Sequence, residues 1–512
     1  MAKNKKHALL PVLGLDPSKA AEYIDDRATP NCKNVSIDRH TIQKRLGTVQ
    51  VGDPLDSETA IGERILAYRE LYTSNANNLI RVGLTKVHSM NYGSGLWTSL
   101  KSPTGGVDMT ASDTNRVDTA LPISSGTRFL VFTNAVDAIQ KWSGAGGYYS
   151  DLSGSPPIAK YIIDYETYLV IANIANYPMR VQWSDTGFPE TWSGGNAGSK
   201  ELSEDGQDIT GLSIFGNYLC VHKETAIYLG YLVGTSSVFK FDRKNTGVGT
   251  VCFDTIKNLP TGEQAFLARD GIHLFNGISA PLIASPIMEE LRQSINPEYI
   301  YKCWSTVAEE ENEYWVGVPV GSQTEAETIY KYNYATKSCH RDERVNITAA
   351  NKFSADLQLT WGDQIGSWQQ ATGRWDDITI TKLFKAIIFG DTAGVSSKRT
   401  DTPNDISTAI DAFWESKDYQ ADEIGRMCRW QKMQLWAKGD TVKVEYSIDA
   451  GSTWVLIENA TLAADYPSGV APLNLYFDVV SAKIRFKFSN NVLNEQFNLK
   501  QFIPWYTERE MT

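Results

Sequence analysis

The sequence predicts an all-β protein, in which a β-propeller of six to eight degenerate blades is followed by a C-terminal β-sandwich. Three observations predict this fold class: short β-branched and aromatic runs, the Gly, Asn and Asp turns between them, and their recurrence along the chain. Aromatic residues make up 11% of the 512 residues, and Gly occurs 39 times. This composition fits strands and turns better than helices. The length favours two or three domains over a single core.

The stretch 165–231 contains the repeating unit in its plainest form. Strand patterns at 167–173 and 179–183 are followed by a Gly-rich loop, and the pattern restarts at 208–215 and 218–229. Short turns between such runs are typical of antiparallel hairpins. A hairpin cannot bury an apolar face alone, so we expect neighbouring units to cover one another.

Aromatic residues close successive units at intervals of about 45 residues, the length of a propeller blade with four short strands. A single helix is predicted at 287–295, where Asn296 and Pro297 stop it. The closing aromatics are Tyr92, Trp142, Trp183, Tyr228, Phe275, Tyr332 and Trp368.

Composition and strand spacing divide the chain into four segments. Residues 1–60 read as a loose N-terminal arm, and the recurring strand pairs define a propeller-like domain at 61–393. The polar, turn-rich segment 394–404 is the predicted linker. Strands at closer spacing then suit a β-sandwich domain at 405–512.

Charge and cysteine usage exclude several classes of protein. The formal net charge of −11 argues against a protein that grips a nucleic-acid backbone, whose footprint is basic. The six cysteines lie far apart without a CxxC pair, and the six histidines form neither HxH nor HExxH. We therefore expect reduced core thiols and no transition-metal site or other cofactor. No apolar stretch is long enough to span a bilayer, and the short, Pro-interrupted apolar run near the N-terminus is not read as a signal peptide.

The sharpest local motif is an Asp-box, S-x-D-x-G-x-T-W, formed by Ser447, Asp449, Gly451, Thr453 and Trp454. In this motif the Ser and Asp side chains bond turn backbone, the Gly adopts a positive φ, and the Trp packs beneath the hairpin. Sialidases carry several copies, but this chain has one, in the predicted sandwich. The motif is therefore interpreted as a structural turn, and no catalytic residue is assigned.

Other candidate motifs are weaker. Ser184, Asp185 and His222 suggest a catalytic triad only by residue type, because no G-x-S-x-G elbow surrounds a serine. No phosphate-binding loop is present, and the chain is not predicted to be an enzyme. Lys44 and Arg45 have the chemistry to contact phosphate, although a solvated hairpin is the simpler interpretation.

Several segments together carry a resemblance to a known family. These segments are 34–38 with 44–48, 181–185, 187–192, 208–212 with 223–228, 247–250 and 265–275, together with the C-terminal hairpin that contains the Asp-box. In these segments the chain resembles the tail hub or nozzle proteins of short-tailed phages, also called packaged-DNA stabilisation proteins.

The resemblance implies a structural virion protein of the phage tail, assembled in the host cytoplasm. It implies a homohexameric ring below the portal and adaptor proteins, in contact with tail fibre or needle proteins. Its axial channel would retain packaged DNA and conduct it during ejection, without sequence-specific binding. Lys44 and Arg45 then become candidate assembly contacts in the N-terminal arm. Two alternatives stay open: a propeller-type receptor- or glycan-binding tail protein, and a glycosidase, which needs paired carboxylates.

Overall fold

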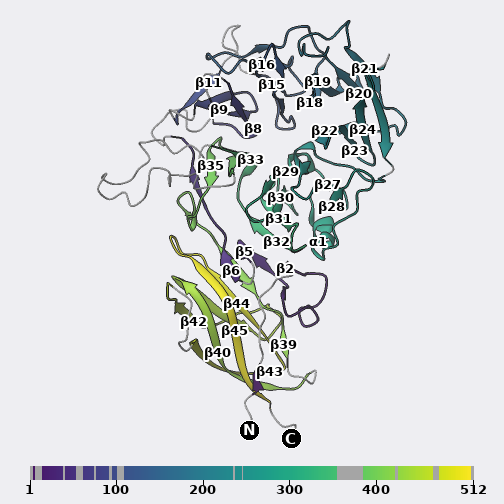
Figure 1. Ribbon diagram of the computed structural model, residues 1–512. Helices are drawn as coiled ribbons and strands as arrows, with labels where there is room; N and C mark the ends of the chain where they lie inside the picture. Colours follow the sequence, from purple (N-terminus) through teal and green to yellow (C-terminus); the bar gives the residue numbers. More distant parts are fainter. Residues whose placement is uncertain are drawn as a thin grey trace, which may run out of the picture.

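The protein is all-β and contains many four-stranded antiparallel sheets, so the predicted fold class is confirmed at this level (Figure 1). In Figure 1 a propeller-like ring of sheets lies above two longer sheets built mainly from the C-terminal part of the chain. The computed structural model describes residues 4–5, 14–38, 41–52, 62–73, 77–91, 95–100, 109–234, 237–244, 246–354, 385–420, 425–464 and 472–508.

Within these residues the ring consists of seven sheets, and each contains a meander of antiparallel strands. The strands of a meander follow one another along the chain, apart from a short hairpin at 123–128 that is inserted in the second sheet. The first four sheets are β8 (Ile65–Tyr72), β9 (Asn77–Gly83), β10 (Val87–Asn91) and β11 (Trp97–Leu100); β12 (Asp118–Ala120), β15 (Leu130–Thr133), β16 (Gln140–Trp142) and β17 (Ser150–Asp151); β18 (Ala159–Tyr165), β19 (Tyr168–Ile174), β20 (Tyr177–Trp183) and β21 (Gly198–Glu201); and β22 (Ile209–Phe215), β23 (Tyr218–Lys223), β24 (Ile227–Leu232) and β25 (Phe239–Lys244). The last three are β26 (Lys257–Asn258), β27 (Gln264–Ala268) and β28 (Gly271–Phe275); β29 (Trp304–Ala308), β30 (Glu313–Val318), β31 (Thr328–Asn333) and β32 (Cys339–Glu343); and β33 (Ile347–Phe353), β34 (Ala386–Asp391) and β35 (Ser396–Arg399).

The ring is closed through the first strands of the sheets. First strands of neighbouring sheets contact one another around the ring, and β33 returns to β8. Between the fourth and sixth sheets the short helix η1 (Phe253–Thr255) makes the connection, because it contacts both β22 and β29. Separate apolar clusters fill six of the seven junctions, as Trp304 and Phe389 do between the sixth and seventh sheets. The junction of the fifth and sixth sheets belongs to a larger cluster that continues into the lower sheets. Each sheet therefore buries both faces against its neighbours, which is what a single hairpin cannot do.

The closing aromatics of the repeat belong to these junctions. Trp142, Trp183, Tyr228, Phe275 and Tyr332 are all buried in the apolar clusters. Their periodic recurrence thus reflects the packing of neighbouring sheets against one another. The two remaining positions of the series, Tyr92 and Trp368, lie outside the described residues.

The seventh sheet is completed by the N-terminal segment, which the sequence analysis did not foresee. The strand β35 lies within 394–404, the predicted linker, and pairs antiparallel with β34 and with β7 (Thr48–Gln50). The linker prediction fails for these residues, because both edges of β35 have hydrogen-bonded partners. The turn-rich composition of 394–404 did not predict that β7, from the N-terminal part of the chain, would pair with the free edge of β35.

The N-terminal segment also joins the other sheets, so residues 14–38 and 41–50 are not a loose arm. The strand β2 pairs parallel with β32 and with β3. The strand β4 pairs with β38 (Ala412–Glu415), and β6 pairs with β45 (Phe497–Glu508). Buried backbone groups need such partners, and these pairings supply them. The strands are β1 (Asn4–Lys5), β2 (Gly14–Leu15), β3 (Ala28–Thr29), β4 (Cys32–Lys33), β5 (Val35–Asp38) and β6 (Thr41–Lys44).

Below the ring, two six-stranded sheets pack face to face across an aromatic core. One has the order β43-β40-β45-β6-β5 with β1 beside β45, and the other β4-β38-β44-β41-β42 with β39 beside β44. Phe502 of the first sheet lies 5.9 Å from Trp414 and 5.0 Å from Phe488 of the second, between ring centroids. The C-terminal strands are β38 (Ala412–Glu415), β39 (Tyr419–Gln420), β40 (Cys428–Gly439), β41 (Thr441–Ser447), β42 (Val455–Thr461), β43 (Leu473–Ser481), β44 (Lys483–Asn490) and β45 (Phe497–Glu508).

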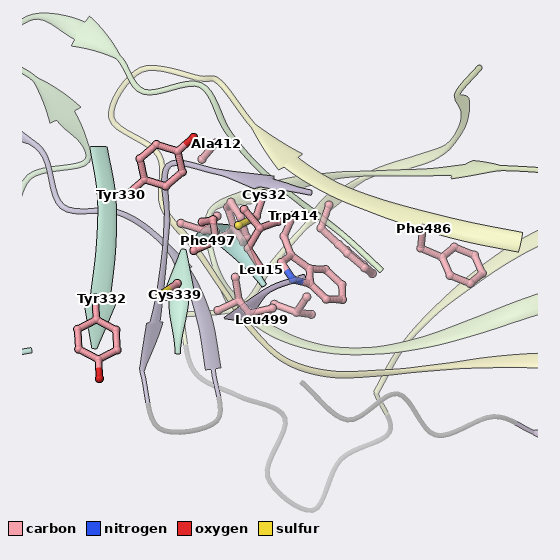
Figure 2. Close-up of a cluster of buried hydrophobic side chains, with 14 of the residues drawn as sticks. Leu15, Cys32, Tyr330, Tyr332, Cys339, Ala412, Trp414, Phe486, Phe497 and Leu499 are labelled. Atoms are coloured by element: carbon pink, nitrogen blue, oxygen red, sulfur yellow. The ribbon is translucent and has the colours of Figure 1, made fainter. Parts of the chain in front are cut away.

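One continuous apolar cluster links the ring to these sheets. Figure 2 shows Leu15 and Cys32 of the N-terminal segment beside Cys339 of β32 and Trp414 of β38. All six cysteines of the chain are buried free thiols. The N-terminal segment therefore supplies the apolar contact between the two halves, and hydrophobic burial holds the halves together.

The remaining elements are small. The predicted helix is present as α1 (Ile287–Ser294), with Ile287, Met288 and Leu291 on its buried side. No helix among the described residues is long and apolar enough to cross a membrane. The other elements are the hairpin β13 (Ile123–Ser124) and β14 (Thr127–Arg128), the helix η2 (Ile300–Lys302), and the pair β36 (Asn404–Asp405) and β37 (Thr408–Ala409).

A buried ionic joint fixes the N-terminal segment between the two halves. The guanidinium of Arg45 donates to both carboxylate oxygens of Asp405, at 2.9 and 2.5 Å, and Arg344 donates to the same carboxylate at 2.8 Å. Burial alone raises the pKa of Asp405, but Arg344 and Arg45 reverse this and hold it well below its usual range. Next to the joint, a Cβ on Gly47 would lie 1.8 Å from the carbonyl oxygen of Asn404, so the close backbone approach requires glycine.

We predict that Asp405→Asn destabilises the protein more than Arg45→Met. Arg45→Met leaves Asp405 paired with Arg344, whereas Asp405→Asn leaves two buried guanidiniums without their shared carboxylate. Breaking a buried ion pair costs about 3–5 kcal/mol, and we expect Arg45→Met to fall near the lower end. Urea unfolding of the full chain measures both free energies. Arg27→Met, which removes an exposed pair with Asp25, is the control and should leave the midpoint unchanged. Equal midpoints for the three variants would contradict the joint.

Candidate functional site

A cavity lies on the axis of the ring, where the first strands of all seven sheets meet. Its volume is about 290 Å³, and its lining includes residues from β8, β12, β18, β22, β26, β29 and β33 together with η1. Strands that run around a central axis leave space between their inward side chains, and this space is where propeller-like rings hold a pocket. We name it the axial cavity. Its charged lining residues are Arg69, Arg116, Asp118, Asp254 and Lys257.

The two arginines of the axial cavity are held by neighbouring sheets. Arg69 of β8 donates through Nε and Nη2 to the hydroxyl and carbonyl oxygens of Thr119, each at 2.7 Å. Arg116 donates through Nη2 to the carboxylate of Asp254 at 2.8 Å. The Nε of Arg116 is buried without a hydrogen-bond partner among the described residues. The Arg69 guanidinium is thus held by a hydroxyl and a backbone oxygen, and the Arg116 guanidinium keeps an unused donor among the described residues.

Asp118 is the most perturbed carboxylate of the cavity. It accepts hydrogen bonds from the backbone N–H groups of Thr119 at 2.8 Å and Ile162 at 2.9 Å. Burial raises the pKa of Asp118 to about 7, although these hydrogen bonds and the nearby Arg69 act in the opposite direction. At neutral pH this carboxyl therefore exchanges between its neutral and charged forms, as groups at functional sites often do.

Lys257 is the third cation of the cavity. Its Nζ donates to the backbone carbonyl oxygen of Asp254 at 3.2 Å. Burial lowers the pKa of Lys257, and the Asp254 carboxylate only partly offsets that effect. The ammonium therefore gains less from its surroundings than it lost in leaving water.

Sequence reasoning did not find this cluster. Its members are spread from position 69 to position 257, on different sheets, and no short motif contains two of the cations. The available signal was a charged residue within or beside an otherwise apolar first strand. Recognising it required knowing which strand of each unit lies innermost.

Lys44 and Arg45, predicted as candidate assembly contacts or as a solvated hairpin, are both buried within the chain. The ammonium of Lys44 donates to Asn490 Oδ1 at 2.9 Å and to the carbonyl oxygens of Val492 and Glu495 at 3.2 and 3.0 Å. Burial lowers the pKa of Lys44 to about 8. Neither side chain is available to another subunit, because the loop before β45 and the ionic joint occupy them.

The Asp-box forms the turn between β41 and β42. Ser447 donates to Asp449 Oδ1 at 2.7 Å, and Asp449 accepts from the backbone and hydroxyl of Thr453 at 2.9 and 2.6 Å. The pKa of Asp449 lies well below its usual range because of these hydrogen bonds, chiefly that from the Thr453 hydroxyl. Gly451 has φ +90°, and Lys487 lies over the ring of Trp454 at 5.2 Å. These interactions stabilise the turn, and no cavity residue is among them.

The histidine that resembles a triad member is a core residue. His222 Nε2 lies 2.9 Å from Gln264 Oε1 and 3.2 Å from Ser213 Oγ, and burial lowers its pKa to about 4. Ser184 instead donates its hydroxyl to the carbonyl oxygen of Asp185. Ser184, Asp185 and His222, which suggest a triad only by residue type, are therefore not assembled into one. Among the described residues, no group of three or more His, Cys, Asp or Glu side chains could hold a metal ion.

The raised pKa of Asp118 predicts a pH-dependent stability. Between about 3.9, the pKa of an unperturbed Asp, and about 7 the folded protein binds more protons than the unfolded chain, so stability falls as pH rises through that window. Asp118→Asn removes this titration. The urea midpoint of the variant should rise relative to wild type between pH 5 and pH 8. Glu310→Gln, at an exposed position, is the control, and a parallel pH dependence of wild type and Asp118→Asn would contradict the assignment.

A second prediction concerns the Asp-box. Asp449→Ala should lower the thermal unfolding midpoint, because the Thr453 hydrogen bonds lose their acceptor. The midpoint of Asp449→Asn should lie between those of Asp449→Ala and wild type. Since the folded pKa of Asp449 is depressed, its contribution is present above pH 4, roughly the unfolded value, and is lost on further acidification. Ser452→Ala, which removes one exposed hydroxyl, should have a smaller effect. Sialoside hydrolysis that Asp449→Ala abolishes would contradict a purely structural role.

Comparison with known proteins gives only distant structural likeness. No family model matches the chain, and no curated protein does either. Among solved structures, Sqt1 from Saccharomyces cerevisiae is similar at 10% identity and a TM-score of 0.31, over 55% of this chain and 94% of that one. An exo-β-1,3-galactanase from Phanerochaete chrysosporium is similar at 10% identity and a TM-score of 0.26, over 90% of this chain and 99% of that one. Likeness at this level carries no argument about function.

Proposed function

We propose that this protein is a structural subunit of a short-tailed phage tail, the hub or nozzle, which forms a homohexameric ring around the path of the packaged DNA. One structural observation supports the proposal above others. The family-like pattern at 34–48 contributes strands to one lower sheet, the adjoining β4 pairs with the other, and Arg45 carries the joint with Asp405 to the ring. These contacts oppose separation of the ring from the lower sheets. A protein that surrounds the path of packaged DNA must withstand such separation.

The finer architecture is part of the same proposal. The seven sheets correspond to a seven-bladed propeller, within the six to eight blades predicted, whose last blade is completed by β7. The two lower sheets correspond to a β-sandwich that includes N-terminal strands. Because a strand from the other end of the domain completes the last blade, backbone hydrogen bonds close the ring. Such closure slows unfolding, which suits a virion protein that must stay folded for long periods.

The DNA channel in this proposal lies between subunits. An axial cavity of about 290 Å³ is at the lower end of the range for small-molecule sites. The major groove of B-DNA alone is roughly 12 Å wide, so a duplex does not pass through one chain. A neutral to acidic channel wall would leave the duplex hydrated and mobile, because clustered Lys and Arg bind phosphates. The net charge of −11 is compatible with such a wall.

The proposed partners follow from the position in the tail. They are further copies of this chain, the portal and adaptor proteins on one side, and tail fibre or needle proteins on the other. Exposed apolar side chains offer surfaces for such contacts, among them Ile278 and Phe188 on the ring and Tyr476 on the lower sheets. The proposed location is the virion tail, after assembly in the host cytoplasm.

A second candidate function, a glycosidase or glycan-binding protein, is favoured by one observation. The axial cavity holds two carboxylates in different environments, Asp118 with a pKa raised to about 7 and Asp254 paired with Arg116. Glycosidases use one protonated and one ionised carboxylate in this way. Turnover of chromogenic glycosides by the wild-type protein, with loss in Asp118→Asn and Asp254→Asn, would favour this candidate over a structural subunit.

The structure of an assembled tail particle tests the primary proposal. We expect a closed ring of this chain around the DNA path, without a continuous basic stripe on the channel wall. The free protein is expected to stay monomeric until a neighbouring tail protein templates the ring, so particles are the appropriate sample. DNA binding by the purified protein in solution gives an independent readout and should be negligible at physiological salt. A basic stripe along the duplex, or strong salt-sensitive DNA binding, would point to a DNA-gripping clamp and contradict the conduit.

A further inference from the structure

We propose that the axial cavity is a binding site for a small oxyanion, a carboxylate or a sulfate-like group, with Arg116 and Lys257 as its principal ligands. The proposal does not depend on the tail function. It concerns the centre of the single chain, whereas the DNA channel lies between copies.

The charge balance of the cavity is the first argument. Its lining contains three cations, Arg69, Arg116 and Lys257, and two carboxylates, Asp118 and Asp254. One positive charge is therefore uncompensated when both carboxylates are ionised, and two when Asp118 is neutral. Buried charges are costly unless an opposite charge or hydrogen bonds compensate them. An anion in the cavity supplies the missing charge.

Unused donors are the second argument. Arg116 commits Nη2 to Asp254, while its Nε is buried without a partner among the described residues. The Lys257 ammonium has three N–H groups and donates to a backbone carbonyl, and within the described residues no salt bridge joins it to a carboxylate. Arginine forks and lysine ammonium groups are the usual protein ligands of carboxylate, sulfate and phosphate oxygens.

The volume and the shape of the cavity limit the ligand. About 290 Å³ accommodates an inorganic oxyanion with several waters, or an acidic monosaccharide. Ser213 and Ser305 also line the cavity, although the Ser305 hydroxyl is already bonded to the carbonyl oxygen of Asp254 at 2.8 Å. The polar lining thus suits a small, hydrated anion and not an apolar molecule.

Asp118 gives the site a pH dependence. From β12 it acts electrostatically on Arg69 of β8, Asp254 of η1, Lys257 of β26 and Tyr161 of β18. Ionisation near pH 7 places a second carboxylate charge beside the ligand. The affinity of the cavity for an anion therefore decreases as pH rises from 6 to 8, and Asp118→Asn removes this decrease.

Isothermal titration of the full chain with sodium sulfate and with sodium glucuronate, at pH 6 and pH 8 and constant ionic strength, tests the site. Sulfate does not titrate in this range, so any pH effect belongs to the protein. We expect one site per chain and a loss of affinity of at least about tenfold in Lys257→Met, since a charge-assisted contact is removed. Lys240→Met removes an exposed lysine outside the cavity and should bind as wild type does. Asp118→Asn should bind equally at both pH values.

The variants are compared only after circular dichroism and the unfolding midpoint show that they are folded. Arg116→Lys, which keeps the charge and loses the fork, provides a second test and should also weaken binding. Binding of sulfate alone supports an inorganic ligand, and binding of both probes supports a site that admits acidic sugars. Binding of glucuronate alone supports a carboxylate ligand. If neither probe binds, or if both Lys257→Met and Arg116→Lys leave the affinity unchanged, the proposal is overturned.

Discussion

The structure depends on the insertion of the N-terminal segment between the ring and the lower sheets. Arg45 and Arg344 share the carboxylate of Asp405, and the backbone of Gly47 approaches Asn404 too closely for any side chain. Around this joint, β7 completes the last sheet of the ring, and β4 and β6 extend the two lower sheets. Neither half has its full complement of strands without this segment, so the ring and the lower sheets stabilise each other.

Ring closure has a chemical consequence at the axis. The sheets bury apolar residues between them, but their first strands cannot fill the centre, and the charged residues there lie in a cavity of about 290 Å³. Arg69 and Thr119, or Arg116 and Asp254, are distant in sequence and meet only because neighbouring sheets pack side by side. The same packing that stabilises the ring therefore creates a group of perturbed ionisable side chains in a cavity.

The two proposals assign different roles to different parts of the molecule. The interlocked strands fit a subunit whose task is to hold its shape in an assembly, and the local burial of charge at the axis fits a small ligand. Both are compatible in one protein, because the axial cavity is enclosed by a single chain and the proposed channel is shared among several. A bound anion would also favour the folded ring, since it binds the native state and not the unfolded chain.

Local patterns in the sequence determined the all-β class, the short antiparallel units, the helix at 287–295 and the Asp-box turn. Each of these depends on residues close in the chain, on side-chain alternation, turn residues and local hydrogen bonds. Tertiary structure alone decided where strands from distant positions pair. It turned the predicted arm into parts of four sheets, placed β35 inside the predicted linker, and buried Lys44 and Arg45. It also brought together the charges of the axial cavity. The reason is physical: a strand edge and a buried charge are satisfied by whichever group the fold places beside them, and the local sequence does not record that partner.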